Sequence, residues 1–339
     1  MNAIPDFEQM LKIGLDAVAD ACKVTRHVQS QLDRIKQATK DDRSPVTVAD
    51  YAAQAVVASR LQTNLGELKM VGEEDARDLR ENSATHLRAA VVESAQMILA
   101  DAQPESVLDA IDLGNHDGSA ESYWTLDPID GTKGFLRGGQ YAVSLAYIVR
   151  GQVVLGVLGC PNLSADFERP FDDPDPSGTL FHALRGEHSW VRPASDPGCK
   201  PSRIKTSEEA NADAIRLCES VEAGHSKLDD SQRILAHLGG RGKPARLDSQ
   251  CKYAVVARGQ ADAYLRLPTR ADYTEKIWDH AAGMIIAEEA GARVTDVHGR
   301  DLDFSHGALL TQNRGVICAP RGIHRRLISA VEELGLFPQ

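Results

Sequence analysis

Several features of membrane and secreted proteins are missing from this 339-residue chain. It contains no apolar run close to the about 20 residues that a membrane span needs. Residues 1–21 mix acidic, basic and apolar side chains, so they match neither a secretion signal nor an Arg/Ser-rich transit peptide. Internal repeats and low-complexity segments are absent as well. We therefore expect a cytoplasmic protein without a membrane partner.

Cysteine pairs and a surplus of basic residues are also absent. The six cysteines are scattered without a C-x-x-C motif, which argues against a zinc site and against a disulfide scaffold. The 38 basic residues are outnumbered by 49 acidic ones, which gives a net charge of −11. A chain of this charge is not expected to bind nucleic acid. A small phosphorylated ligand is still compatible, because bound metal ions reverse the local charge.

The composition that is present is typical of a large globular protein, with 42% hydrophobic and 26% charged residues. The length suggests two domains. Apolar spacing predicts a long amphipathic helix over residues 6–35, and alternation predicts antiparallel strands between residues 143 and 191. Proline and glycine cluster at 193–203, so we divide the chain into 1–197 and 198–339. After this point strands and helices alternate, which indicates a partly parallel second sheet.

One short stretch combines two carboxylates with a proline and a glycine: Asp127-Pro128-Ile129-Asp130-Gly131-Thr132. Pro128 biases Asp127 away from helical angles, so a preceding strand is predicted to stop there. Gly131 allows a turn, and Thr132 can open a short helix whose free N–H groups face an anion. With the Ile129 carbonyl, these groups suit Mg²⁺ and a phosphate. The same residues are also typical of an ordinary capped turn.

Three more acidic residues stand at predicted element ends. Asp50 can cap a second helix, Glu73 follows a short strand, and Asp279 opens a later helix. Each of them alone is explained by capping or by a solvated turn. Together with Asp127 and Asp130 they can form one hard-metal cluster without any Cys or His ligand. This is the set of carboxylates that a phosphoester hydrolase with two or three metals needs.

Three segments in this order carry a family resemblance: Gly72-Glu73-Glu74, Asp127 to Thr132, and Trp278-Asp279-His280-Ala281-Ala282-Gly283. They resemble the signatures of the lithium-sensitive, Mg²⁺-dependent phosphatase superfamily of inositol monophosphatase. Segments 44–54, 221–226, 247–253 and 261–268 are similar to its 3′(2′),5′-bisphosphate nucleotidase branch. The resemblance implies an α/β fold: an α-β-α-β-α sandwich with an α+β first part, an antiparallel first sheet and a mixed second sheet.

The resemblance also implies site roles and cofactors. Asp50, Thr132 and Glu73 would orient and activate the attacking water, and the Gly131 and Thr132 N–H groups would bind the scissile phosphate. Two or three Mg²⁺ ions are implied, with Li⁺ inhibiting by competition at the second metal. The implied metal ligands are Glu73, Asp127, the Ile129 carbonyl, Asp130 and Asp279.

In the nucleotidase branch the second phosphate and the nucleoside are held by the opposite domain. Lys252 and Arg266 can supply the fixed cations that a second dianionic phosphate needs. The ordinary alternatives are a solvated helix residue for Lys252, a strand-edge charge for Arg266 and a helix cap for His225. The positions that match this branch are Glu222, His225, Ser249, Lys252 and Arg266.

The implied activity is removal of the 3′-phosphate from adenosine 3′,5′-bisphosphate, giving AMP, by a monomeric enzyme. The sulfate donor PAPS is a further expected substrate. Two alternatives remain open at this point. One is an inositol polyphosphate 1-phosphatase, and the other is a non-catalytic sensor of the bisphosphate nucleotide.

Overall fold

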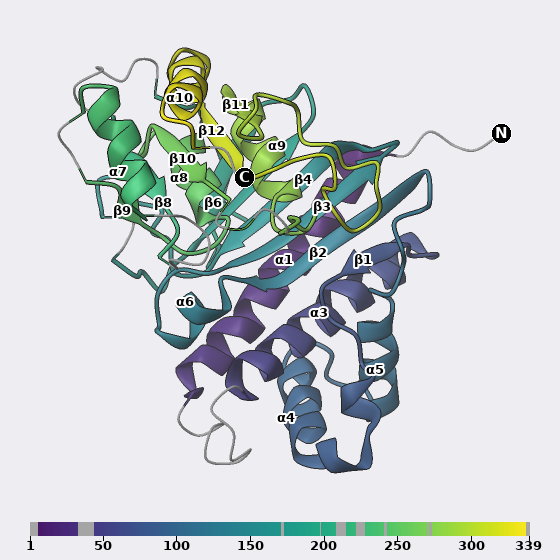
Figure 1. Ribbon diagram of the computed structural model, residues 1–339. Helices are drawn as coiled ribbons and strands as arrows, with labels where there is room; N and C mark the ends of the chain where they lie inside the picture. Colours follow the sequence, from purple (N-terminus) through teal and green to yellow (C-terminus); the bar gives the residue numbers. More distant parts are fainter. Residues whose placement is uncertain are drawn as a thin grey trace.

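The computed structural model of the chain is built of alternating layers of helices and sheets (Figure 1). It describes residues 6–32, 44–170, 173–196, 198–207, 215–221, 228–240, 243–268, 270 and 273–336. Helices of the first half cover one face of a seven-stranded sheet, and two central helices separate it from a five-stranded sheet. Two outer helices cover the smaller sheet. The α-β-α-β-α order predicted from the sequence is confirmed.

The first outer layer consists of long helices packed on the large sheet and on one another. The first of them begins where Asp6 accepts a hydrogen bond from the Gln9 N–H at 3.0 Å, as an N-cap does. Its apolar stripe is buried against the sheet, so the predicted amphipathic helix is confirmed. The helices of this layer are α1 (Phe7–Ser30), α3 (Ser44–Leu65), α4 (Thr85–Gln96) and α5 (Pro104–Asp112), with 3₁₀ turns at Asp78–Arg80 and Asn82–Ala84.

The second of these helices begins earlier than the sequence predicted. α3 starts at Ser44, so Asp50 lies within the helix and does not cap it. Pro45 does not delay the start, because the N–H that proline lacks would be unpaired in the first turn anyway. The capping interpretation of Asp50 is therefore wrong. Its buried carboxylate needs another explanation.

The large sheet has the strand order β1-β2-β3-β4-β5-β6-β7. Its neighbours pair antiparallel, as predicted, except β1 and β2, which are parallel. Parallel neighbours end at the same edge of a sheet, so residues that follow β1 lie beside the end of β2. The strands are β1 (Met70–Gly72), β2 (Ser122–Asp130), β3 (Ala142–Val149), β4 (Gln152–Cys160), β5 (Thr179–Leu184), β6 (Ser189–Pro193) and β7 (Ser202–Ile204).

The smaller sheet has the order β11-β12-β10-β8-β9 and is mixed, as predicted. β8 pairs in parallel with both β9 and β10, whereas β12 pairs antiparallel with β10 and β11. Its strands are β8 (Leu217–Glu219), β9 (Ala245–Arg246), β10 (Ala263–Arg266), β11 (Ala292–Thr295) and β12 (Val316–Pro320).

Two helices between the sheets join the halves of the molecule. They are α8 (Cys251–Ala257) and α9 (Ala281–Glu289). A Cβ atom on Gly156 of β4 would lie only 2.4 Å from Ile285 of α9, so this close approach requires glycine. Gly291 follows α9 in the left-handed conformation, at φ 108°, as predicted for its C-terminal end.

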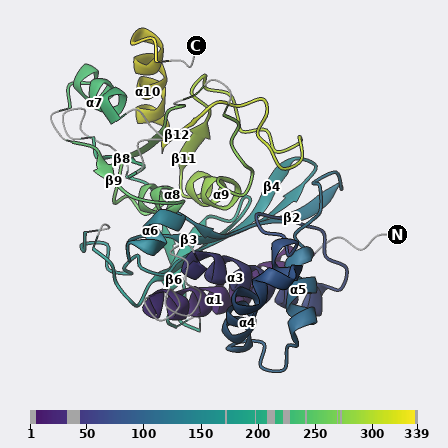
Figure 2. The ribbon, with the colours of Figure 1, turned by 60° about the horizontal axis from the view of Figure 1, so that its bottom comes forward.

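The far side of the smaller sheet is covered by α7 (Leu228–His237) and α10 (Arg321–Glu333). Figure 2 shows them at the end of the molecule opposite to α1, α3, α4 and α5. The short helix α6 (Thr132–Leu136) extends from the end of β2. Among the described helices, none combines the length and the apolar character required to cross a membrane. The domain division at residue 197 stays a prediction, and the first sheet itself extends to β7.

A buried histidine of α10 predicts how stability depends on pH. His324 contacts the Thr295 hydroxyl at 2.8 Å, and burial together with the charge of Arg293 lowers its pKa from 6.5 to about 4. The unfolded chain takes up this proton below about pH 6.5, so the contribution of neutral His324 is present above that pH and is lost toward pH 4.

Between about pH 7 and pH 5, we expect the unfolding free energy of wild type to fall by about 2 kcal/mol more than that of His324→Gln. Urea unfolding at the two pH values measures this loss. His86→Gln, on an exposed position of α4, is the matched control. An equal pH dependence in wild type and His324→Gln would contradict the prediction.

Candidate active site

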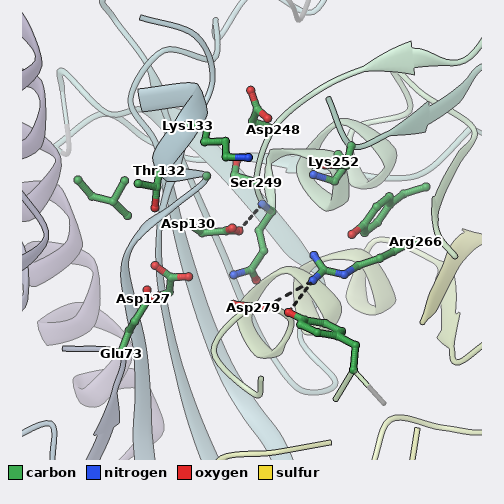
Figure 3. Close-up of a pocket in the computed structure, with 16 residues that line it drawn as sticks. Glu73, Asp127, Asp130, Thr132, Lys133, Asp248, Ser249, Lys252, Arg266 and Asp279 are labelled. Carbon is green, nitrogen blue, oxygen red and sulfur yellow. Dashed lines mark hydrogen bonds and ion pairs between the residues drawn. The ribbon is translucent and has the colours of Figure 1, made fainter. Parts of the chain in front are cut away.

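Glu73 and the end of β2 meet because β1 and β2 are parallel. Glu73 follows β1 directly, and its N–H donates to the Leu126 carbonyl at 3.2 Å. Asp127 is the next residue of β2, and both side chains line one cavity (Figure 3). The predicted short strand before Glu73 is thereby confirmed, and its pairing explains why these two acids are neighbours.

A bulge in β2 turns Asp127 and Asp130 to the same side. Asp127 pairs with Ser144 and Asp130 with Ala142, so three steps along β2 face two steps along β3. In a regular strand, residues three apart point to opposite faces, and one extra residue reverses this. The sequence predicted that the strand stops at Asp127. This prediction is wrong, because the strand continues through the bulge to Asp130. The bulge also takes Ile129 out of the regular pairing.

The turn after β2 brings the two halves of the chain into contact. Gly131 has φ 91°, and α6 begins at Thr132, as predicted. A Cβ atom on Gly131 would lie 2.9 Å from the Cβ of Ser249, so glycine is required both for its backbone angle and for space. Ser249 itself has φ 66°, a left-handed conformation that costs free energy in a non-glycine residue and that clusters at functional sites.

Most of the predicted site residues line one cavity at this contact. Its volume is about 280 Å³. Figure 3 shows Glu73, Asp127 and Asp130 on one side and Lys252 and Arg266 on the other. The lining residues are Glu73, Asp127, Ile129, Asp130, Gly131, Thr132, Lys133, Ser220, Asp248, Ser249, Gln250, Lys252, Tyr264, Arg266, Tyr273 and Asp279.

Asp127 provides the test of whether this cavity fits a cation. The residue is 2% exposed, and its Oδ1 atom has no hydrogen-bond partner. Burial, followed by the charges of Glu73, Asp130 and Asp279, raises the pKa of Asp127 well above its ordinary value. A bound cation would pair with the free oxygen and offset the repulsion. Because all of these acids offer oxygen ligands, the set fits a hard divalent ion such as Mg²⁺.

Residues of the second half complete the acidic side. Asp279 precedes α9 and lines the cavity. The backbone N–H of Gln250 donates to Asp130 Oδ2 at 2.5 Å. The Gln250 side chain donates to the Trp278 carbonyl at 2.8 Å and accepts from the Gly283 N–H at 2.9 Å. Gln250 therefore connects the end of β2 with the start of α9.

Two cations face the acids across the cavity. Lys252 of α8 is 3% exposed, donates to the Leu247 carbonyl at 3.1 Å and lies 5.3 Å from the ring centre of Tyr264. Burial lowers its pKa, and the negative charge of Asp130 opposes this change. Arg266 ends β10, with a side chain that is 11% exposed. The sequence alternatives of a solvated lysine and an exposed strand-edge arginine are therefore wrong.

Asp50 lies on α3 and is not among the residues that line the cavity. Burial and the charges of Glu74 and Glu73 raise its pKa well above the ordinary value. Asp50 therefore belongs to the same repelling group of acids. Glu222 and His225, the other two expected site residues, lie outside the described part of the chain.

Six lining residues were not predicted as site residues from the sequence: Lys133, Ser220, Asp248, Gln250, Tyr264 and Tyr273. Lys133 and Gln250 are direct neighbours of residues that were named, Thr132 and Ser249, so their positions carried a signal. Tyr273 lies in the loop before Asp279, where no periodic pattern marks it.

Residues 6–336 match the inositol monophosphatase family along almost the whole chain. This protein belongs to the inositol monophosphatase family. A relative named 3′(2′),5′-bisphosphate nucleotidase, from Schizosaccharomyces pombe, is 41% identical over 96% of this chain and 95% of its own length. Another from Arabidopsis thaliana, named 3′,5′-bisphosphate nucleotidase 2, is 38% identical over 96% of this chain and 97% of its own.

Solved structures of the family share the fold. An inositol monophosphatase from Anabaena superposes with a TM-score of 0.61 at 21% identity and covers 97% of both chains. CysQ from Bacteroides thetaiotaomicron superposes with a TM-score of 0.63 at 19% identity, over 93% of this chain and 98% of its own. The family and the fold class predicted from the sequence are both confirmed.

The buried carboxylate of Asp127 is predicted to lower the stability of the metal-free protein and to be required for stabilisation by Mg²⁺. We expect Asp127→Asn to raise the unfolding free energy of the metal-free protein by about 1 kcal/mol or more, because it removes a repelled charge. The stabilisation of wild type by added Mg²⁺ should be lost in this variant. Thermal unfolding in EDTA and in excess Mg²⁺ measures both effects.

The matched control is Asp262→Asn. Asp262 is equally buried, but its carboxylate accepts from the Arg216 side chain at 2.7 Å and from the Arg216 N–H at 2.8 Å. This substitution should lower stability with or without Mg²⁺. A metal-free Asp127→Asn protein that is less stable than wild type would contradict the assignment of Asp127 to a cation site.

Proposed function

We propose that this protein is a metal-dependent phosphatase that removes the 3′-phosphate of adenosine 3′,5′-bisphosphate and releases AMP. One observation carries the proposal: acids and buried cations face each other across a single cavity. A ligand that satisfies both sides needs two separate anionic groups. One phosphate lies at the acids through bound cations, and the other pairs directly with Lys252 and Arg266.

The metal ligands that we propose are the oxygen donors of the acidic side. The set consists of Glu73, Asp127, the Ile129 carbonyl, Asp130 and Asp279, which all line the cavity. Two or three Mg²⁺ ions agree with this donor type and with the general Mg²⁺ dependence of the family. When bound, they supply charge neutralisation for the phosphate ester and acidify the attacking water.

The chain's own residues act around this centre. On the resemblance, Asp50 and Thr132, with Glu73, orient and activate the attacking water. The N–H groups of Gly131 and Thr132 bind the scissile phosphate at the turn that leads into α6. Ser249, Lys252 and Arg266 hold the part of the substrate that does not react. Glu222 and His225 are proposed nucleoside contacts on the resemblance alone.

The choice of a nucleotide over an inositol phosphate rests on the relatives and on the cations. Relatives at 38–42% identity carry the name bisphosphate nucleotidase. An inositol polyphosphate 1-phosphatase is less favoured by these names, and a non-catalytic sensor has no need of Asp50, Asp130 and Thr132 together. We include PAPS as a substrate because it carries the same 3′-phosphate. A monomeric, cytoplasmic enzyme is a proposal from the sequence alone.

Phosphate release from a panel of substrates tests the function. With Mg²⁺, adenosine 3′,5′-bisphosphate and PAPS should be hydrolysed faster than inositol 1-phosphate and inositol 1,4-bisphosphate. Li⁺ should inhibit, through competition at the second metal. Faster hydrolysis of the inositol phosphates would overturn the proposed substrate, and nucleotide binding without any turnover would favour the sensor.

Asp130 gives the sharpest test of the proposed metal ligands. We expect Asp130→Asn to lower kcat by about a thousandfold or more, because the cation that it holds stabilises the leaving oxygen. Asp101→Ala, on an exposed position away from the cavity, is the control. Turnover close to that of wild type would remove Asp130 from the site.

A further inference from the structure

A chain of buried polar side chains lies behind Arg266. The Arg266 guanidinium is held by both carboxylate oxygens of Glu275: Nε donates to Oε1 at 2.9 Å, and Nη2 lies 2.7 Å from Oε2. His280 Nε2 lies 3.3 Å from the same Oε2, and the Tyr253 hydroxyl lies 2.9 Å from His280 Nδ1. Glu275, His280 and Tyr253 are 3% exposed or less.

The hydrogen bonds of this chain have one consistent direction. A carboxylate only accepts, so Nε2 of His280 carries the proton and donates to Glu275. Nδ1 then accepts from the Tyr253 hydroxyl. The charge of Arg266, with the hydrogen bonds from His280 and Arg266, outweighs burial and holds the pKa of Glu275 at about 2, so it is an anion beside the guanidinium. Each member is thus satisfied, which fixes the Glu275 carboxylate in one orientation.

Arg266 needs such a partner because it stands between two acidic groups. Its Nη2 is 3.8 Å from Asp279 Oδ2, which is one of the proposed metal ligands. Without Glu275, the guanidinium would pair with Asp279, where it would compete with the metal and leave the opposite wall. Nε and Nη2 of Arg266 contact Glu275, and Nη2 also lies 3.3 Å from the Tyr273 hydroxyl. Its Nη1 makes no hydrogen bond to a described residue.

We propose that Glu275, fixed by His280 and Tyr253, is a positioning residue that aims Arg266 at the non-reacting phosphate of the substrate and keeps it away from Asp279. The inference rests on the proposed function, since it requires a ligand with a second phosphate. It adds a specificity determinant that lies behind the cavity wall and does not touch the substrate itself.

The distances also allow another reading, because Glu275, Asp279 and His280 place possible ligand atoms within 4.8 Å of one another. The occupied bonds argue against a metal at this point. Both Glu275 oxygens already bind a guanidinium, and both His280 nitrogens have partners. A cation there would also stand beside the positive charge of Arg266.

Binding of AMP and of adenosine in EDTA, measured by calorimetry, tests the proposal without turnover. AMP keeps the phosphate that is not removed, and adenosine lacks it. We expect Glu275→Gln to weaken AMP binding by about ten- to a hundredfold, the cost of a misplaced charge-assisted hydrogen bond, and to leave adenosine binding unchanged. With adenosine 3′,5′-bisphosphate, KM should rise, and the Mg²⁺ concentration for half-activation should rise with it because the released guanidinium competes with the metal at Asp279, whereas kcat at saturating substrate and Mg²⁺ should change little.

Glu288→Gln is the matched control, because Glu288 of α9 is half-buried and pairs with Arg185 at 3.5 Å outside this cavity. Glu275→Asp, which keeps the charge but withdraws it from the guanidinium, is the second variant if Glu275→Gln does not fold. It too should weaken AMP binding alone.

Three results would overturn the proposal: unchanged AMP binding in the Glu275 variants, equal losses for AMP and adenosine, or a shifted Mg²⁺ requirement with normal AMP binding. The last would assign Glu275 to a metal. Failure of the proposed function is distinguishable, because wild type would then fail to hydrolyse the nucleotide whatever the effect of Glu275→Gln on AMP binding.

Discussion

Repulsion among carboxylates is the constraint on which this structure depends. Asp127 is nearly inaccessible to water, has an oxygen without a partner and shares its cavity with Glu73, Asp130 and Asp279. Holding such charges together without a counterion costs free energy in a low-dielectric interior. The backbone must therefore maintain an arrangement that the side chains alone would avoid. The bulge in β2 and the contact between Gly131 and Ser249 serve this purpose.

The acids come from both halves of the chain, so the site exists only where the halves are packed together. Gln250 connects Asp130 to the segment that carries Asp279 through three hydrogen bonds. Behind it, α9 lies so close to β4 that Gly156 has no room for a side chain. Cations that bind the acids of both halves would stabilise this junction further, since any ligand of the folded state does so. Metal binding at the proposed site would thus be linked to the packing of the two sheets.

The parts of the site that could be predicted are those with a local cause. Pro128, Gly131 and the strand ends mark Asp127, Asp130 and Glu73 within a few residues of sequence. The bulge could not be predicted, because pairing register depends on β3 as much as on β2. The expectation that Asp50 caps a helix was wrong because a helix can begin before a proline as well as after it. Glu275 was missed because its ion pair joins a strand to a loop, and the functions of all these residues stay predictions.

The proposed function assigns substrate choice and chemistry to opposite walls of the cavity, yet the two walls are not independent. Arg266 stands 3.8 Å from Asp279, so the cation that we propose to select a second phosphate also lowers the repulsion among the acids that we propose as metal ligands. A lysine could provide the charge, but it lacks the planar guanidinium. The guanidinium binds Glu275 with two of its nitrogens and keeps its remaining N–H donors available. A guanidinium that Glu275 holds in place can therefore face a second phosphate and lower the repulsion at Asp279 at the same time. A family that varies its substrates on one metal centre must then change this wall without disturbing the charge balance of the other.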